Sequence, residues 1–183
     1  MPAPADVVRT YILAKDGNRP FLMTQAFAEN AELEMEVRTD AISFPSSTKG
    51  LTAIEDLLVR RFGTDNENVY TFCLSRPAEG NRHRFGCHWL VGMSAKNGGQ
   101  VRVGCGRYDW HFGSDEAGLV KKLVIVIDVM KVFPASELPA TMTWLSGLPY
   151  PWCTADEAAE KMPRGGEFAA IEAYLSEVRP VSP

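Results

Sequence analysis

The sequence predicts an α+β fold in which helices lie on one face of an antiparallel sheet. Three observations predict it: mostly helical apolar spacing before Gly63, long stretches of β-forming residues over 69–130, and proline-punctuated helical pieces after Phe133. Helices first and consecutive strands afterwards is the order typical of this class.

The first half is predicted to hold three helices. Residues 6–16 form a helix that Asp6 caps, and residues 18–27 form a second with Pro20 in its first turn. Residues 52–62 form the third, which Thr52-Ala53-Ile54-Glu55 opens as a capping box. These helices are expected to cover the sheet.

One strand is predicted among these helices. Residues 31–37 alternate apolar and acidic side chains without exception, which a period of two explains and a helix does not. Leu33, Met35 and Val37 are therefore expected to face inward, and Glu34 and Glu36 to face solvent.

The middle of the chain is predicted to be four strands, over residues 69–74, 85–95, 101–112 and 119–130. Asn97-Gly98-Gly99 is a turn signal, because asparagine and glycine tolerate positive φ. Residues 119–130 are apolar on both faces, so we expect helices to cover one side and a partner subunit the other.

Residues 135–183 are predicted to be a helical extension packed on the 1–134 domain, too short and broken to hold a core of its own. A cluster of large apolar residues lies in it, and this cluster either closes a pocket as a lid or docks on a larger partner. Its members are Trp144, Leu145, Leu148, Tyr150 and Trp152.

Composition argues against several classes of protein. The net charge is −4 with both signs scattered along the chain, which disfavours nucleic-acid binding. No apolar run approaches the roughly 18 residues of a membrane span, and the first residues lack the features of a signal peptide. The four cysteines form no CxxC pair. We therefore expect a cytoplasmic protein with reduced thiols and no metal site.

The same order of elements, with Tyr11 in the first helix, resembles the SnoaL-like proteins of the nuclear transport factor 2-like, cystatin-like superfamily, which includes ketosteroid isomerase. The stretch AFAENAELE at residues 26–34 is similar to that superfamily's "lfaddavwe" segment. Gly50-Leu51-Thr52-Ala53-Ile54 resembles its G-x-x-A-I helix start, and Gly106-Arg107-Tyr108 its G-x-Y strand. The resemblance covers residues 6–130.

The resemblance implies a conical α+β barrel: N-terminal helices packed in a strongly curved antiparallel sheet, with an apolar pocket for a small organic ligand at the open end. It also implies a homodimer through the outer sheet face. The superfamily holds isomerases, cyclases, dehydratases, epoxide hydrolases and proteins without known catalysis, so the fold does not decide the function.

The superfamily's isomerase site is matched only in part. In such sites an Asp base shuttles a proton while a Tyr and a protonated Asp bind the enolate oxygen. Tyr11 matches the Tyr of the first helix, but Met35 stands where the base is expected. This departure disfavours steroid-type isomerisation.

The segment Arg107 to Phe112 admits two arrangements. A bulge near Gly104-Cys105-Gly106 would turn Tyr108, Trp110 and Phe112 to the core and leave Asp109 and His111 in solvent. Without a bulge, Asp109 and His111 would share the pocket face with Val101, Val103 and Cys105, as an acid/base pair about 7 Å apart.

Asp128 is a second candidate, because it interrupts an apolar strand. SnoaL-like cyclases resemble this segment and use an Asp near the end of the last strand as acid/base, so Asp128 is its counterpart. Alternatively, Asp128 lies at the pocket rim or caps the chain as it leaves the sheet. Trp89, Met35 and Trp110 either form a ligand-binding wall for a flat apolar molecule or fill the core.

We therefore expect a small-molecule-binding protein with an apolar pocket. Its chemistry would be acid/base isomerisation, cyclisation or dehydration of a carbonyl compound without a cofactor, carried by Asp128, Asp109, His111 and Tyr11. The alternative is a non-catalytic ligand-binding or dimeric assembly module.

Overall fold

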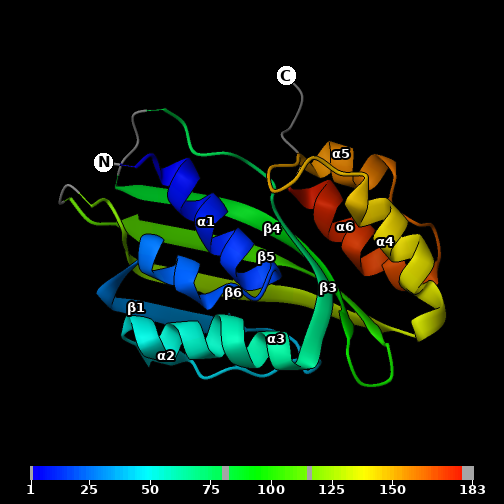
Figure 1. The fold of residues 1–183 in the computed structure, drawn as a ribbon. Coiled ribbons are helices and arrows are strands. Elements are labelled where there is room, and N and C mark those ends of the chain that lie inside the picture. Colours follow the sequence, from blue (N-terminus) through cyan, green and yellow to red (C-terminus); the bar gives the residue numbers. More distant parts are fainter. Residues whose placement is uncertain (1, 80–82, 115–116, 179–183) are drawn as a thin grey trace.

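The computed structural model describes residues 2–79, 83–114 and 117–178 (Figure 1). The first half holds short helices and two strands. They are α1 (Pro4–Asp16), the 3₁₀ helix η1 (Pro20–Gln25), β1 (Phe27–Val37), β2 (Ser47–Lys49), α2 (Leu51–Glu55), the π-helical η2 (Asp56–Arg61) and α3 (Phe62–Asp65). The last three run on without a break as one rod.

Four long strands follow, and then the C-terminal helices. The strands are β3 (Asn66–Cys73), β4 (Arg84–Ala95), β5 (Val101–Phe112) and β6 (Val120–Phe133). The helices are η3 (Ala135–Glu137), α4 (Leu138–Ser146), α5 (Ala155–Glu160), η4 (Gly166–Phe168) and α6 (Ala169–Glu177). Not one of the described helices has the length and apolar character that a membrane crossing requires.

The strands form one curved six-stranded sheet in the order β2-β1-β6-β5-β4-β3. The predicted strands over 85–95 and 101–112 are confirmed, joined through Gly98 and Gly99 at positive φ. The sheet is not wholly antiparallel as predicted, because β1 pairs with β6 in parallel. After β1 and β2 the chain passes through α2, η2 and α3 before it forms β3 to β6. The first long strand, β1, lies beside the last strand, β6.

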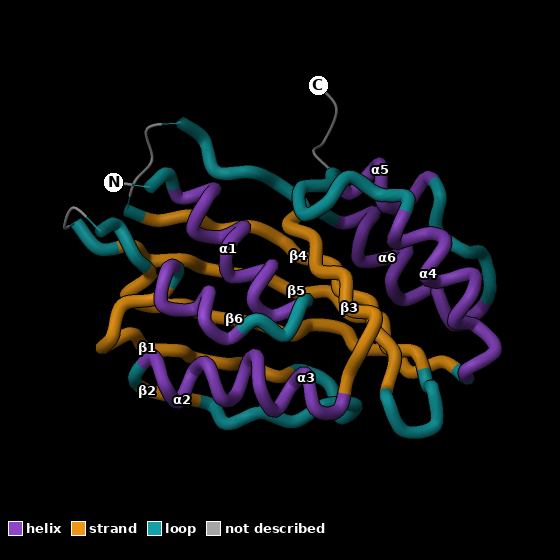
Figure 2. The backbone as a smooth tube through the Cα atoms, viewed as in Figure 1, coloured by secondary structure: helices purple, strands orange, loops and turns teal. Residues whose placement is uncertain are grey.

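The two faces of the sheet are covered by different parts of the chain (Figures 1 and 2). We call the face under α1 to α3 the inner face, and the opposite one the outer face. Helices α4 to α6 pack on the outer face beside β3, β4 and β5, with a core of their own. The prediction that helices lie on one face is therefore wrong.

The C-terminal extension packs on the sheet and contributes no residue to the lining of the inner cavity, so it is not a lid over that cavity. Trp144, Leu145 and Leu148 are buried against Leu90 and Val103 on the outer face. The strand residues that they cover alternate with inner-face residues, so both faces of β4 and β5 are apolar there. Thr154 and Glu157 form a capping box at the start of α5.

Three helix predictions need correction. Asp6 does not cap the first helix, because α1 begins at Pro4 and Asp6 lies within its first turn. Residues 18–27 hold only the short η1: Phe21 is 73% exposed, and Phe27 begins β1 through pairing with Val120. The rod α2–η2–α3 begins after Gly50 rather than at a Thr52 capping box. Gly50 has a φ of 86°, and its N–H donates to the Ala31 carbonyl oxygen at 2.8 Å. This positive φ turns the chain from β2 into the helix.

Candidate functional site

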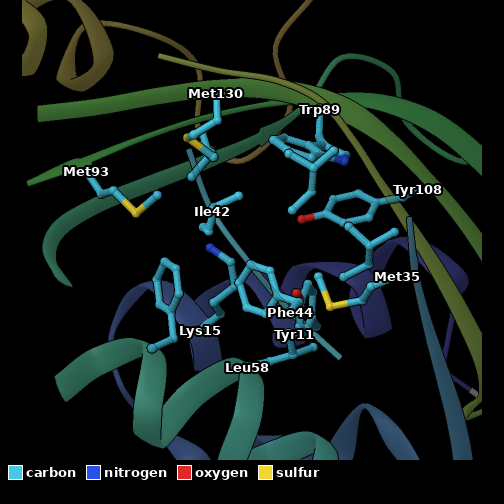
Figure 3. Close-up of a pocket in the computed structure, with 14 residues that line it drawn as sticks. Tyr11, Lys15, Met35, Ile42, Phe44, Leu58, Trp89, Met93, Tyr108 and Met130 are labelled. Atoms are coloured by element: carbon cyan, nitrogen blue, oxygen red, sulfur yellow. The ribbon is translucent and has the colours of Figure 1, made fainter. Parts of the chain in front are cut away.

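A cavity lies between the inner face of the sheet and the N-terminal helices (Figure 3). The space in which a water-sized sphere can be centred is about 50 Å³, and the empty space is about 460 Å³ when the open solvent at the mouth is included. Helices α1, η2 and α3 supply one wall, strands β1, β4, β5 and β6 supply another, and the loop 38–46 supplies two further residues. The lining residues are Tyr11, Lys15, Met35, Ile42, Phe44, Leu58, Phe62, Trp89, Val91, Met93, Tyr108, Ile125, Ile127 and Met130.

The lining is apolar, aromatic and rich in sulfur. Met35, Met93 and Met130 face the cavity together with the rings of Trp89 and Tyr108. Among the described residues, the lining includes no Asp, Glu or His. Such a cavity suits a mostly apolar molecule, and its described lining offers no carboxylate or imidazole as a general base.

Tyr11 brings a buried hydroxyl to this cavity. Its side chain is fully buried, with its ring edge-on to Trp110 at 5.2 Å between centroids. The hydroxyl has no hydrogen-bond partner with good geometry among the described residues. Burial raises the pKa of Tyr11, and the nearby Tyr108 hydroxyl opposes this only in part. Tyr11 therefore stays protonated and can donate a hydrogen bond.

Lys15 lies one helical turn after Tyr11 on the same face of α1, and its ammonium points into the cavity (Figure 3). Its Nζ donates to Asp16 Oδ1 at 3.1 Å and to Thr71 Oγ1 at 2.8 Å, and lies 4.6 Å from the centre of the Phe62 ring. An ammonium has three donors, so one remains for a ligand.

Asp16 compensates the charge of Lys15. Its carboxylate also accepts from the Thr71 backbone N–H at 2.7 Å, from Thr71 Oγ1 at 2.7 Å and from the Tyr150 hydroxyl at 2.9 Å. The Asp16 side chain is only 5% exposed. These bonds hold the end of α1 against β3 and the C-terminal extension.

The sequence patterns did not single out Lys15 and Asp16 as site residues. A signal was present: Lys15 follows Tyr11 by four residues, which places it on the buried stripe of the first helix. Asp16 was interpreted as the helix end, which it is. Its partner Thr71 is 55 residues away, and no local pattern connects the two.

Of the three residues predicted to bind ligand, two line the cavity and one does not. Trp89 and Met35 line the cavity. Trp110 lies behind Tyr11 and is fully buried, and its indole N–H has no partner among the described residues. Trp110 therefore packs against the back of the Tyr11 ring rather than facing the cavity.

Asp109 and His111 lie on the outer face. Arg84 binds the Asp109 carboxylate through two nitrogens at 2.7 and 2.8 Å, and His111 Nε2 is 3.1 Å from Asp109 Oδ2. The hydrogen bond from Arg84 lowers the pKa of Asp109, and the contact with His111 lowers it further. An acid/base role in the cavity requires both groups to line it, and they do not.

Neither predicted arrangement of this strand is fully right. Tyr108, Trp110 and Phe112 do face the inner core, but β5 alternates without a switch of faces. Val101 and Val103 point outward, like Asp109, and are buried there by the C-terminal extension. The valines therefore do not mark the pocket face.

Asp128 also points to the outer face. It is the extra residue of a β-bulge, because Cys105 pairs with Val129 and Gly106 with Ile127. Its carboxylate meets Arg38 Nη1 at 2.9 Å and Arg107 Nε at 3.4 Å, and accepts from the Tyr174 hydroxyl at 3.2 Å.

Asp128 thus helps to join α6 to the sheet. Tyr174 also donates to the Gly106 carbonyl oxygen at 2.9 Å and lies 2.8 Å from His88 Nδ1. The interpretation of Asp128 as a rim or capping residue is closer to this geometry than a place in the cavity. Among the described residues, no group of three or more His, Cys, Asp or Glu is arranged to hold a metal ion.

Comparisons with known proteins find similarity in structure alone. No protein-family model and no curated protein sequence matches the chain. A nuclear transport factor 2-like superfamily protein from Salmonella enterica serovar Typhimurium matches with a TM-score of 0.54 at 13% identity, over 68% of this chain and 88% of that one.

Two further structures extend the comparison. A hexachlorocyclohexane dehydrochlorinase (LinA) of type 2 matches with a TM-score of 0.54 at 13% identity, over 70% of this chain and 84% of that one. A protein with a ketosteroid isomerase-like fold from Catenulispora acidiphila, in complex with trimethylamine, matches with a TM-score of 0.52 at 14% identity, over 68% of this chain and 85% of that one. This chain therefore has the nuclear transport factor 2-like fold, as the sequence predicts.

Proposed function

We propose that this protein binds a small, largely apolar molecule in the inner cavity, with an oxygen acceptor of that molecule bonded to Tyr11. The observation that carries the proposal is the buried Tyr11 hydroxyl, which has no hydrogen bond of good geometry among the described residues, although the Tyr108 hydroxyl lies nearby. A buried polar group without a hydrogen bond destabilises a protein by about 1–3 kcal/mol. A ligand oxygen at this position would remove that penalty.

The polar groups of the cavity favour a carbonyl as that oxygen. The Lys15 ammonium is a pure donor, and the protonated Tyr11 hydroxyl can donate as well. Burial also raises the pKa of Tyr108 well above its usual value, so its hydroxyl stays protonated. The remaining lining is apolar. The similar structures include a dehydrochlorinase and a trimethylamine complex, which supports a small molecule as the ligand.

Replacing Tyr11 by Phe is expected to weaken binding of a ketone probe. We expect the Kd of 2-acetylnaphthalene, measured by calorimetry, to rise about three- to tenfold, the usual effect of one neutral hydrogen bond. Tyr70→Phe is the matched control, because Tyr70 packs with the outer-face core. Equal Kd values for the Tyr11→Phe variant and the wild type would contradict the proposal, and so would a wild type that does not bind.

A second candidate is acid/base catalysis on a carbonyl compound: isomerisation, cyclisation or dehydration without a cofactor. Donors at a carbonyl oxygen stabilise an enolate, which favours this chemistry. Of the predicted catalytic residues, only Tyr11 lines the cavity. The same ketone, incubated with protein in D₂O, distinguishes the two functions. Protein-dependent deuteration beside the carbonyl, seen by NMR, supports catalysis, and its absence leaves binding alone.

We further propose a homodimer through the part of the outer face that the C-terminal helices leave open. Val124 and Val126 lie there, within a rim of Arg38, Arg107 and Glu36. Light scattering is expected to give twice the 20.2 kDa chain mass for the wild type, and one chain mass for Val124→Arg. A wild type of one chain mass would contradict the dimer.

A further inference from the structure

We infer that the ligand of the inner cavity is an uncharged conjugated or aromatic carbonyl compound, and that the Lys15–Asp16 pair excludes carboxylates. This inference rests on the proposed function and deepens it. It concerns the charge of the ligand, which the presence of a cavity does not decide.

The charge of the site carries the first step. Lys15 is the one residue with a full charge in the described lining, and Asp16 lies against it with Nζ 3.1 Å from Oδ1. The two side chains are 10% and 5% exposed, so water screens the pair little. The pair has no net charge. A carboxylate that entered the cavity would lose its hydration without meeting an uncompensated cation.

Hydrogen bonds hold the Asp16 carboxylate in place beside Lys15. To bind a ligand carboxylate as an ion pair, Lys15 would have to release Asp16. Asp16 is held by Thr71 and Tyr150 through three further hydrogen bonds of 2.7 to 2.9 Å. It would then remain buried beside the new anion as a like charge. Only the third N–H of Lys15 is left for a ligand, together with the Tyr11 hydroxyl, and a neutral carbonyl oxygen fits both.

The walls of the cavity are aromatic and rich in sulfur. The rings of Trp89 and Tyr108 are 5.7 Å apart between centroids, and Met35 and Met130 line the cavity with them. Thioether sulfurs make favourable contacts with aromatic rings, and unbranched Met side chains adapt to the shape of a ligand. These walls therefore favour an apolar body with aromatic or conjugated character over a polar one.

Three probes of one shape test the inference at pH 7 with the wild-type protein. They are 2-acetylnaphthalene, 2-ethylnaphthalene and 2-naphthoate, with Kd measured by calorimetry. We expect the ketone to bind about tenfold or more tighter than the carboxylate, and tighter than the hydrocarbon. A carboxylate that binds as tightly as the ketone would overturn the inference. So would a hydrocarbon that matches the ketone.

Asp16→Asn tests the role of the pair directly. Without the carboxylate, Lys15 becomes an uncompensated cation, and we expect the preference to shift by about tenfold toward 2-naphthoate. An unchanged ratio in a folded variant would overturn the role of Asp16. If the variant does not fold, the ratio in the wild type still decides. If no probe binds the wild type, the proposed function itself fails, whereas binding with a preference for the carboxylate refutes only this inference.

Discussion

Deletion of residues 134–183 is expected to leave a chain that aggregates or stays partly unfolded. The C-terminal helices bury Phe72, Leu90, Val101, Val103 and Phe133 on the outer face. Each such side chain contributes about 1.5–3 kcal/mol when buried, and the net stability of a domain is only about 5–15 kcal/mol. Exposure of all these side chains would remove most of the net stability and would leave an apolar patch on the sheet.

The measurement is the soluble fraction on expression, followed by thermal unfolding and near-UV circular dichroism of any soluble product. Truncation after Val178 is the control, because it keeps α4, α5 and α6. A soluble 1–133 fragment with cooperative unfolding would show that the barrel folds by itself. It would also return the extension to the role of a docking surface.

Gly106→Ala is expected to destabilise the protein by about 3 kcal/mol, as overpacking of a tight core does. A Cβ at Gly106 would meet the Val126 carbonyl oxygen of the neighbouring strand and would lie 2.5 Å from Cζ2 of the Trp89 ring. Backbone stands on one side and a buried ring on the other, so the strain cannot be relieved by a surface side chain. We expect a fall of more than about 6 °C in Tm.

Gly86→Ala is the control for this substitution. Gly86 lies on β4, and the nearest atom to its added Cβ is the Tyr108 carbonyl oxygen at 3.7 Å, an ordinary contact. Alanine also restricts the unfolded chain more than glycine does, so stability should stay level or rise by about 0.5 kcal/mol. Equal losses at both positions would show that the contact of Gly106 with Trp89 and Val126 is not the cause.

The local sequence pattern predicted most helices and strands. Most of the wrong predictions concern contacts between distant segments of the chain. Alternation placed Leu33 and Met35 inward and Glu34 outward, and the structure agrees. The fold class followed from the order of elements. The pairing of β1 with β6 was not foreseen, because these strands lie far apart in the sequence and a parallel pair has no turn signal between its members.

The candidate site shows the same division. Tyr11, predicted as catalytic, and Trp89 and Met35, predicted to bind ligand, line the cavity, because each lies on the buried side of a periodic element; their roles stay predictions. One of the two predicted arrangements places Asp109 and His111 beside valines on a pocket wall. They do share a face with Val101 and Val103, but it is the outer face, and the valines are covered there by helices that begin at Leu138, 35 residues after Val103.

Helix and strand periods are local properties of the backbone, so the amino-acid pattern is enough to predict which side chains share a face. The face of β5 that encloses the cavity follows only from packing, because the C-terminal helices make the outer face apolar too. Packing also brings Asp16 of α1 together with Thr71 and Tyr150, which lie far from it in the sequence. The charge of Lys15 is compensated by this Asp16 carboxylate. Contacts between distant segments depend on packing, and the local spacing of residues does not predict packing.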